Sequence, residues 1–85
     1  MFYYVYVLKA DKDKMFYTGY TKDLKLRFKQ HQNKKVSSTK ERGSFKLIYY
    51  EACLNQQDAT HREKYLKTHL GKMFLRNRLK SYLIG

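Results

Sequence analysis

The sequence contains no proline, only four glycines and one cysteine. Because 42% of its residues are hydrophobic and 16% are aromatic, the composition excludes a disordered or low-complexity chain. The single cysteine, Cys53, cannot form an internal disulfide and supplies too few thiols for a cysteine-based zinc site. We therefore expect a folded domain in which Cys53 is an ordinary packing residue.

Acidic residues and long apolar runs are also scarce. Seven Asp and Glu stand against nineteen Lys and Arg, so the net charge is +12, and nucleic acid is the polyanion best suited to relieve the resulting self-repulsion. No apolar run approaches the roughly 18 residues of a membrane-spanning helix, and the N-terminus lacks the residue order of a signal peptide. We expect a cytoplasmic protein that binds DNA, with no membrane association and no small-molecule cofactor.

The first half of the chain predicts a hairpin followed by a helix. Residues 2–8 and 15–20 are largely aromatic or β-branched, which is typical of strands covered on both faces, and the charged stretch between them predicts an antiparallel turn. Tyr6 and Tyr17 should then lie close together. Apolar residues recur every three or four positions in residues 23–33 and predict a helix.

The second half predicts a loop, a third strand and two helices. Residues 33–44 are polar and basic, and residues 45–52 are again nearly continuously apolar. Asn55 is a good N-cap for the next helix, which Gly71 should end. The predicted class is α+β, a single domain over residues 1–85 with a three-stranded antiparallel sheet flanked by helices in the order ββαβαα. The inner faces of the two helices should consist of Ala59, Glu63, Leu66 and Leu70 in the first, and of Leu75, Leu79, Tyr82 and Leu83 in the second.

Glu63 is the position that fits a purely structural role least well. At about 100° per residue it falls within about 40° of Ala59 and about 60° of Leu66, so its carboxylate points towards the core side. Burying an unpaired carboxylate costs several kcal/mol, and such a group is normally paired with a cation or bound to a metal. Both alternatives stay open, and a salt bridge is the commoner of the two.

Two basic residues and a group of tyrosines admit both structural and functional interpretations. Arg27 and His31 lie one turn apart on the predicted helix, near its edge with the sheet, where each could also be a solvated surface residue. Of the nine tyrosines, Tyr4 and Tyr6 share one face of the first strand. Their hydroxyls could form part of a site or could simply lie at the rim of a small core.

Together these residues resemble the GIY-YIG nuclease family, which is named for two tripeptides on paired strands. The tripeptides here are YVY at residues 4–6 and YTG at residues 17–19. The first differs from the family name at two positions and the second at one, but Tyr6, Tyr17 and Gly19 are kept.

The segments that follow are also similar to the family. TKDLKLRFKQH resembles its next helix, with the family's arginine at Arg27 and a histidine one turn later at His31. REKYLK puts the family's metal-binding glutamate at Glu63, so the resemblance extends over about residues 3–70. The tail GKMFLRNRL is similar to that of short single-domain members, and Asn77 matches a polar residue that some members place near the phosphate.

The resemblance implies hydrolysis of DNA phosphodiester bonds with one divalent metal ion, Mg²⁺ or Mn²⁺, held by Glu63. Tyr6 or Tyr17 would help to activate the attacking water, although a phenol is a weak base at neutral pH unless nearby cations favour its deprotonated form. Arg27 would supply such a cation and clamp the phosphate, and His31 would accept the tyrosine's proton or contact the phosphate. Tyr20 occupies the place of a lysine in some relatives. The supporting or phosphate-contacting candidates are Tyr4, Gly19, Tyr20, Lys22 and Asn77.

Three functions stay open from the sequence. The first is a DNA endonuclease of repair, recombination or mobile-element processing, and the second is a basic DNA-binding module of the same fold that is catalytically weak or inactive. Both predict salt-sensitive DNA binding. The third is a structural or RNA-associated protein, in which Glu63 is paired internally and metal has no effect. Because family members usually take specificity from an appended domain and none is evident here, we expect DNA shape or an accessory protein to select the substrate.

Overall fold

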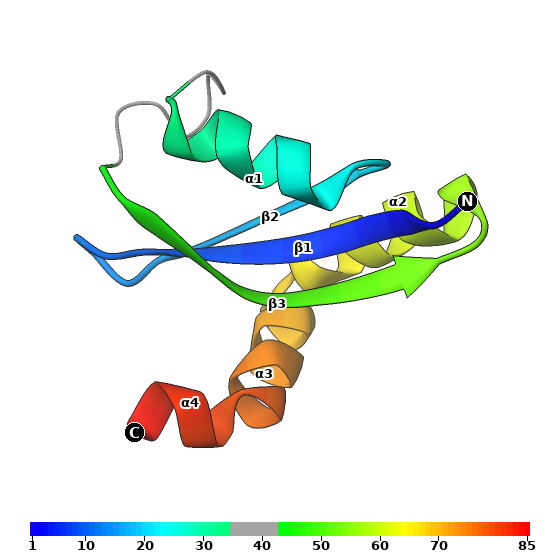
Figure 1. Ribbon diagram of the computed structural model, residues 1–85. Coiled ribbons are helices and arrows are strands. Elements are labelled where there is room, and N and C mark those ends of the chain that lie inside the picture. Colours follow the sequence, from blue (N-terminus) through cyan, green and yellow to red (C-terminus); the bar gives the residue numbers. More distant parts are fainter. Residues whose placement is uncertain (35–42) are drawn as a thin grey trace.

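The computed structural model describes residues 1–34 and 43–85. The predicted α+β class and the order ββαβαα are confirmed, and a five-residue helix, α4, follows α3. Most of the predicted loop at residues 33–44 lies outside the described residues. In the part of the chain that is described, no helix is long and apolar enough to cross a membrane. The elements in Figure 1 are β1 (Tyr3–Ala10), β2 (Phe16–Thr21), α1 (Leu24–Gln32), β3 (Phe45–Cys53), α2 (Gln56–Leu66), α3 (His69–Arg78) and α4 (Lys80–Ile84).

The sheet is antiparallel with the strand order β2-β1-β3, so β1 is its central strand. The predicted hairpin joins β1 to β2, and the Ala10 N–H donates to the Met15 carbonyl at 2.9 Å to close its turn. Pairing on the two sides places Gly19 of β2 and Tyr50 of β3 opposite Tyr6. The register between β1 and β3 contains a bulge just after this position.

Helices cover both faces of the sheet, and each face has its own apolar core. Figure 1 shows α1 on one side of the sheet and α2 and α3 on the other. This division follows from the alternation of side chains along β1, a strand buried on both faces. The core under α1 consists of Tyr6, Leu8, Ala10 and Phe45, with Tyr17, Leu24, Phe28 and Leu47 packed against it. The core under α2 and α3 consists of Val5, Val7, Ala59, Leu66 and Leu75.

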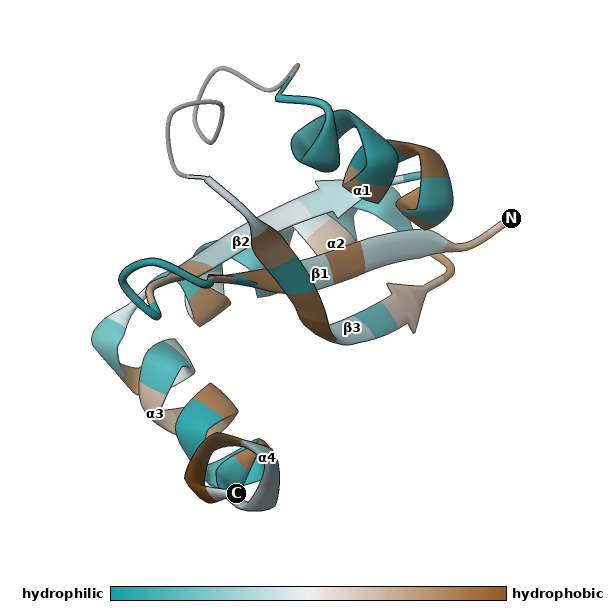
Figure 2. Cartoon of the chain, turned by 60° about the vertical axis from the view of Figure 1, so that its left-hand side comes forward, coloured by the Kyte–Doolittle hydropathy of each residue, from teal (hydrophilic) through white to brown (hydrophobic). Residues whose placement is uncertain are grey.

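The start of α1 is fixed immediately after β2. The Asp23 carboxylate accepts a hydrogen bond from the Leu26 N–H at 3.0 Å and caps the helix, because the first N–H groups of a helix have no partner inside it. Figure 2 shows that the ribbon of α1 is mostly hydrophilic, so only a narrow stripe of the helix packs on the sheet. The cap therefore determines where Arg27 and His31 meet the strands.

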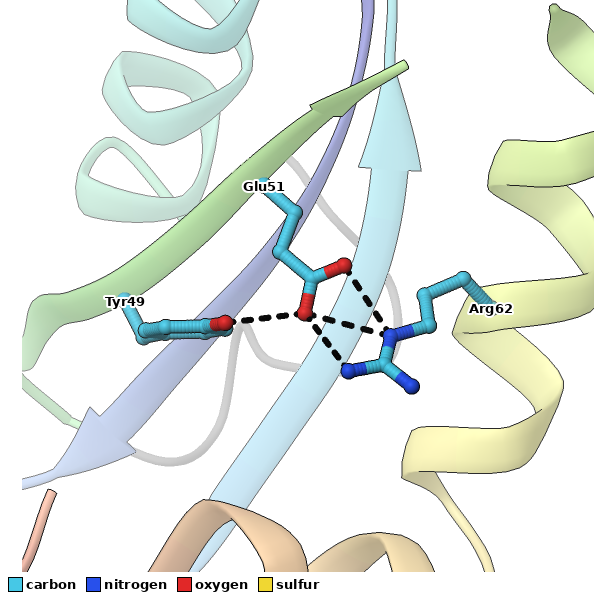
Figure 3. A network of polar contacts seen from close by, with 3 residues as sticks. All are labelled: Tyr49, Glu51 and Arg62. Carbon is cyan, nitrogen blue, oxygen red and sulfur yellow. Dashed lines mark hydrogen bonds and ion pairs between the residues drawn. The ribbon is translucent and has the colours of Figure 1, made fainter. Parts of the chain in front are cut away.

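A polar network anchors α2 on β3 (Figure 3). Arg62 of α2 donates from Nε and Nη2 to the two carboxylate oxygens of Glu51 on β3, at 3.0 and 2.9 Å. The Tyr49 hydroxyl donates to the same carboxylate at 2.9 Å, and burial together with this bond raises the pKa of Tyr49. The guanidinium also lies 4.6 Å from the centre of the Phe74 ring. Because a bidentate pair has a defined geometry, the network fixes the rotation of α2 and with it the direction of the neighbouring Glu63.

Asn55 caps α2 as predicted, but the prediction that Gly71 ends this helix is wrong. The Asn55 side-chain oxygen accepts from the N–H groups of the first turn, and α2 ends at Leu66. Thr68 then caps α3, with its hydroxyl accepting from the Gly71 N–H at 3.1 Å. Gly71 is buried inside α3, where a Cβ would collide with the backbone of Tyr65 and Leu66. The glycine is needed for the close crossing of α3 over the end of α2.

The boundary between α2 and α3 differs from the predicted one, and this difference changes which side chains face the core. Leu70, predicted to lie on the inner face of the helix that Asn55 caps, belongs to α3 and is exposed. Tyr82, predicted on the inner face of the last helix, is also exposed, on α4. Leu75 is fully buried as predicted, and Leu79 and Leu83 are half-buried.

Candidate active site

The hydroxyl of Tyr6 is the centre of a buried polar group under α1. It lies 2.9 Å from Nε2 of His31, and the Arg27 Nε donates to it over a longer distance of 3.4 Å. Tyr6 and His31 are only 3% and 4% exposed, and their rings meet edge to face with centroids 5.6 Å apart. The expectation that His31 could be a surface residue is therefore wrong, because its ring packs into the core under α1. The structure brings Tyr6, Arg27 and His31 together.

Gly19 makes room for the Tyr6 ring. A Cβ at position 19 would lie 2.5 Å from the Tyr6 hydroxyl oxygen and 2.7 Å from the ring carbon that bears it, closer than side chains pack. The ring thus extends from the central strand across β2, which is an edge strand. Position 19 must be a glycine for the hydroxyl to lie above this edge.

The electrostatics of the group determine the direction of its hydrogen bonds. Burial, followed by the positive charge of Arg27, lowers the pKa of His31 below its ordinary value of 6.5. His31 is therefore neutral at pH 7, and its Nε2 is able to accept a proton. Since the Arg27 guanidinium can only donate, the Tyr6 oxygen accepts from it. In the His31 tautomer whose Nε2 carries no proton, the Tyr6 hydroxyl donates to that nitrogen. Arg27 is held from its other side by Gln30, whose side-chain oxygen accepts from Nη1 at 3.2 Å.

Tyr17 lies on the same face of the sheet, next to this group. Its ring packs edge to face on Phe45 at 5.2 Å, and Phe45 in turn lies 6.4 Å from the His31 ring. The prediction that Tyr6 and Tyr17 lie close together is confirmed to the extent that both belong to the core under α1. Phe45 is a site residue that the sequence did not identify, because its position depends on how β3 pairs with β1.

Glu63 lies on the other side of the sheet, on α2. Its carboxylate accepts from the Lys67 ammonium at 3.0 Å, and its side chain is 19% exposed. Gln56, seven residues earlier and therefore on the same flank of the helix, reaches the Tyr20 hydroxyl on β2 at 2.8 Å. Glu63 is thus half-buried on the flank of α2 that faces the edge strand, in a salt bridge that was one of the two alternatives from the sequence.

The described residues do not form a metal site in which protein side chains supply most of the ligands. Among them, no three or more His, Cys, Asp or Glu side chains are grouped so that they could hold an ion. A single carboxylate such as Glu63 fits an ion that takes its other ligands from water and from a substrate phosphate, the usual manner in which Mg²⁺ binds.

The five residues predicted to support the site or contact the phosphate are divided between the two faces of the sheet. Gly19 contacts Tyr6, and Tyr4 and Lys22 line a pocket beside α1. Tyr20 instead packs against the core under α2 and α3. Asn77 is exposed on α3, which covers that same face.

Comparisons with known proteins identify the family of this chain. The sequence model of the GIY-YIG catalytic domain matches residues 2–82. A UPF0213 protein of Clostridium perfringens is 45% identical over 65 residues, which are 75% of this chain and 69% of that protein. A UPF0213 protein of Limosilactobacillus reuteri is 41% identical over 68 residues, with 76% and 70% of the two chains covered. This chain belongs to the GIY-YIG catalytic domain family.

A solved structure supports the fold as well. The solution NMR structure of a UPF0213 protein from Bacillus halodurans has a TM-score of 0.57 to this chain at 35% sequence identity. The match covers 91% of this chain and 84% of the other, so the similarity includes both faces of the sheet.

Proposed function

We propose that the protein is a divalent-metal-dependent endonuclease that hydrolyses phosphodiester bonds in DNA. The observation that supports this most directly is the Tyr6 hydroxyl held between a neutral His31 and the guanidinium of Arg27. A phenol that only packs needs one hydrogen-bond partner, whereas this arrangement combines a proton acceptor with a cation that stabilises a phenolate. Membership of a catalytic-domain family agrees with an enzymatic role.

In this proposal Tyr6 and His31 form a proton path. Tyr6 gives its proton to Nε2 of His31, and the phenolate, stabilised by Arg27, takes a proton from the attacking water. The hydroxide oxygen bonds to phosphorus as the bond from phosphorus to the 3′ oxygen breaks. The leaving 3′ oxygen takes a proton from solvent and becomes a hydroxyl. His31 releases its proton to solvent, and Tyr6 is again a neutral phenol. Arg27 also neutralises charge on the phosphate oxygens in the transition state.

Glu63 is the residue proposed to hold the metal ion, Mg²⁺ or Mn²⁺. The ion would act as a Lewis acid and neutralise the charge that develops on the leaving 3′ oxygen. Glu63 lies on the flank of α2 towards β2, and the Tyr6 hydroxyl lies above the same edge strand on the other face. We therefore propose the edge of β2 as the place where the scissile phosphate binds.

The charge of the surface suits a DNA substrate. Lys22, Lys25 and Lys29 are exposed on and beside α1, next to the proposed site, and the whole chain has a net charge of +12. Contacts between such residues and phosphates release counterions, so binding should weaken steeply with salt. We propose repair, recombination or mobile-element processing as the setting, in the cytoplasm, with an accessory protein supplying specificity.

A second candidate is a binding module of the same fold without useful catalysis. The salt bridge between Glu63 and Lys67 favours it, because the carboxylate already has a cation as its partner. Plasmid nicking separates the two functions. Purified protein is incubated with supercoiled plasmid in Mg²⁺, Mn²⁺ or EDTA, beside Glu63→Ala and Arg27→Ala at matched DNA occupancy. The endonuclease nicks only with metal and both substitutions abolish nicking, whereas a binding module binds the plasmid and leaves it supercoiled.

A further inference from the structure

A pocket of about 530 Å³ adjoins the candidate active site, between the start of α1 and the strands β1 and β3. This volume lies within the range of pockets that enclose small organic groups. The lining combines two tyrosines, an apolar floor and two lysines: Tyr4, Tyr50, Leu24, Phe28, Lys22 and Lys25. We call it the α1 pocket.

The aromatic wall of the α1 pocket is open to solvent. Tyr50 on β3 is 55% exposed, and Tyr4 on β1 meets it edge to face with ring centroids 6.1 Å apart and planes at 63°. This arrangement leaves ring faces accessible to a planar group that enters the pocket. Aromatic faces of this kind are the surfaces on which nucleobases stack, whatever their sequence.

The rim of the α1 pocket is positively charged. Lys22 and Lys25 are exposed at the start of α1, whose N-terminal end adds a partial positive charge. Asp23, between them, also lines the pocket, and its carboxylate accepts from the Leu26 N–H and caps the helix. The rim thus complements phosphate groups, while the pocket itself complements an aromatic ring.

The α1 pocket lies on the same face of the sheet as Tyr6. Tyr50 is the cross-strand partner of Tyr6, and Leu24 and Phe28 pack against the same core as Tyr6. Directly opposite residues in antiparallel strands have Cα atoms about 5 Å apart. A group in the pocket therefore lies beside the backbone of Tyr6, whose ring extends the other way, across β2.

We propose that the α1 pocket binds one unpaired nucleobase of the DNA substrate, stacked on Tyr50 and bordered by Tyr4, with the adjoining phosphates held by Lys22 and Lys25. This inference rests on the proposed endonuclease function and adds a substrate preference to it. A base inside a duplex is paired and stacked, so only an unpaired or extruded base can enter. The enzyme should then select DNA with an unpaired nucleotide near the cut.

The test compares two duplexes that differ in one base. Both contain a single extra nucleotide at the centre of one strand, which is either thymidine or an abasic residue, and binding is measured in EDTA so that no cleavage occurs. The wild type should bind the thymidine bulge about fivefold to a hundredfold more tightly, the range expected for one stacked base. Tyr50→Ala should remove the preference and Tyr50→Phe should keep it. Tyr82→Ala, which removes an exposed tyrosine from α4, is the matched control and should also keep it.

Equal binding of the two bulged duplexes by the wild type, or an unchanged preference in Tyr50→Ala, overturns the α1 pocket as a base-binding site. Neither result affects metal-dependent nicking, so the endonuclease assignment would survive. A preference that Tyr50→Ala removes, in a protein that never nicks plasmid, supports the pocket and overturns the catalytic proposal.

Discussion

A Cβ on Gly19 would lie 2.5 Å from the hydroxyl oxygen of Tyr6. The atom that it would meet is the far end of a side chain, so the fold can adjust by moving the Tyr6 ring. We therefore predict that Gly19→Ala changes stability little but displaces the hydroxyl from His31 and Arg27. A displacement of about 1 Å can slow catalysis by about a hundredfold. Cleavage rates and melting temperatures measure the two effects, with Thr18→Ala on the opposite face of β2 as control. Full activity in Gly19→Ala would refute the positioning role of the glycine.

The lowered pKa of His31 predicts a loss of stability in mildly acidic solution. In the unfolded chain histidine takes up a proton near pH 6.5, whereas folded His31, buried beside Arg27, takes it up only at lower pH. Between these two values the unfolded state binds more protons, so stability is full above about pH 6.5 and decreases as the pH falls through the window. His31→Gln should remove this part of the pH dependence, measured by melting temperature at a series of pH values. His61→Gln, which changes an exposed histidine of α2, should not.

The cleavage rate should depend on pH for the same reason. His31 accepts the proton of Tyr6 only when it is neutral, so the rate should decrease as the solution is acidified below the lowered pKa of His31. A rate that stays constant through that range would exclude His31 as the proton acceptor.

The salt bridge between Lys67 and Glu63 predicts competition with the metal ion. If Glu63 is the metal ligand, the Lys67 ammonium at 3.0 Å occupies the carboxylate when metal is absent. Lys67→Ala should then lower the Mg²⁺ concentration needed for half-maximal cleavage by up to about fivefold, the scale of an exposed ion pair. Lys64→Ala, in the last turn of α2, is the charge-matched control. If both variants require the same Mg²⁺ as the wild type, the pairing has no connection with metal binding.

The close crossing of α2 and α3 predicts that adding one methyl group at Gly71 destabilises the fold. Gly71→Ala would bring a methyl group against the backbone of Tyr65 and Leu66, which cannot move as a side chain does. Overpacking of this kind destabilises by about 1–3 kcal/mol, which lowers the melting temperature of a domain of this size by at least about 4 °C. Lys72→Ala, the next residue on α3 and an exposed one, should leave the melting temperature nearly unchanged. An equally stable Gly71→Ala would show that the two helices can separate at little cost.

The sequence predicted the elements better than the packing between them. The apolar runs and the spacing of Leu24 and Phe28 identify the strands and α1, because burial on one or two faces leaves a periodic pattern. Asn55 was identified as a cap by its side-chain chemistry alone. Gly71 was misread because a glycine at a helix end and a glycine at a helix crossing look the same in sequence. Only the position of the neighbouring helix distinguishes them.

For the candidate active site too, the sequence identified individual residues better than the contacts between elements. Tyr6, Arg27 and His31 could be selected by family resemblance and by their helix and strand spacing, and the structure brings them together. Phe45 and Tyr50 could not be selected, because their positions opposite β1 depend on a bulge that leaves no signal in the sequence. Contacts that cross between strands and helices have to be measured in three dimensions.

The central claim is that the Tyr6 hydroxyl takes part in the chemical step. Single-turnover cleavage of a DNA oligonucleotide with excess enzyme and Mg²⁺ measures that step for the wild type, Tyr6→Phe and Tyr82→Phe. Tyr6→Phe removes only the oxygen, so it should bind DNA normally and cleave about 10²- to 10⁴-fold more slowly, the usual contribution of a positioned base. Tyr82→Phe, which removes a hydroxyl far from the site, should cleave at the wild-type rate. If Tyr6→Phe cleaves as fast as the wild type, the hydroxyl is not catalytic and the account is wrong.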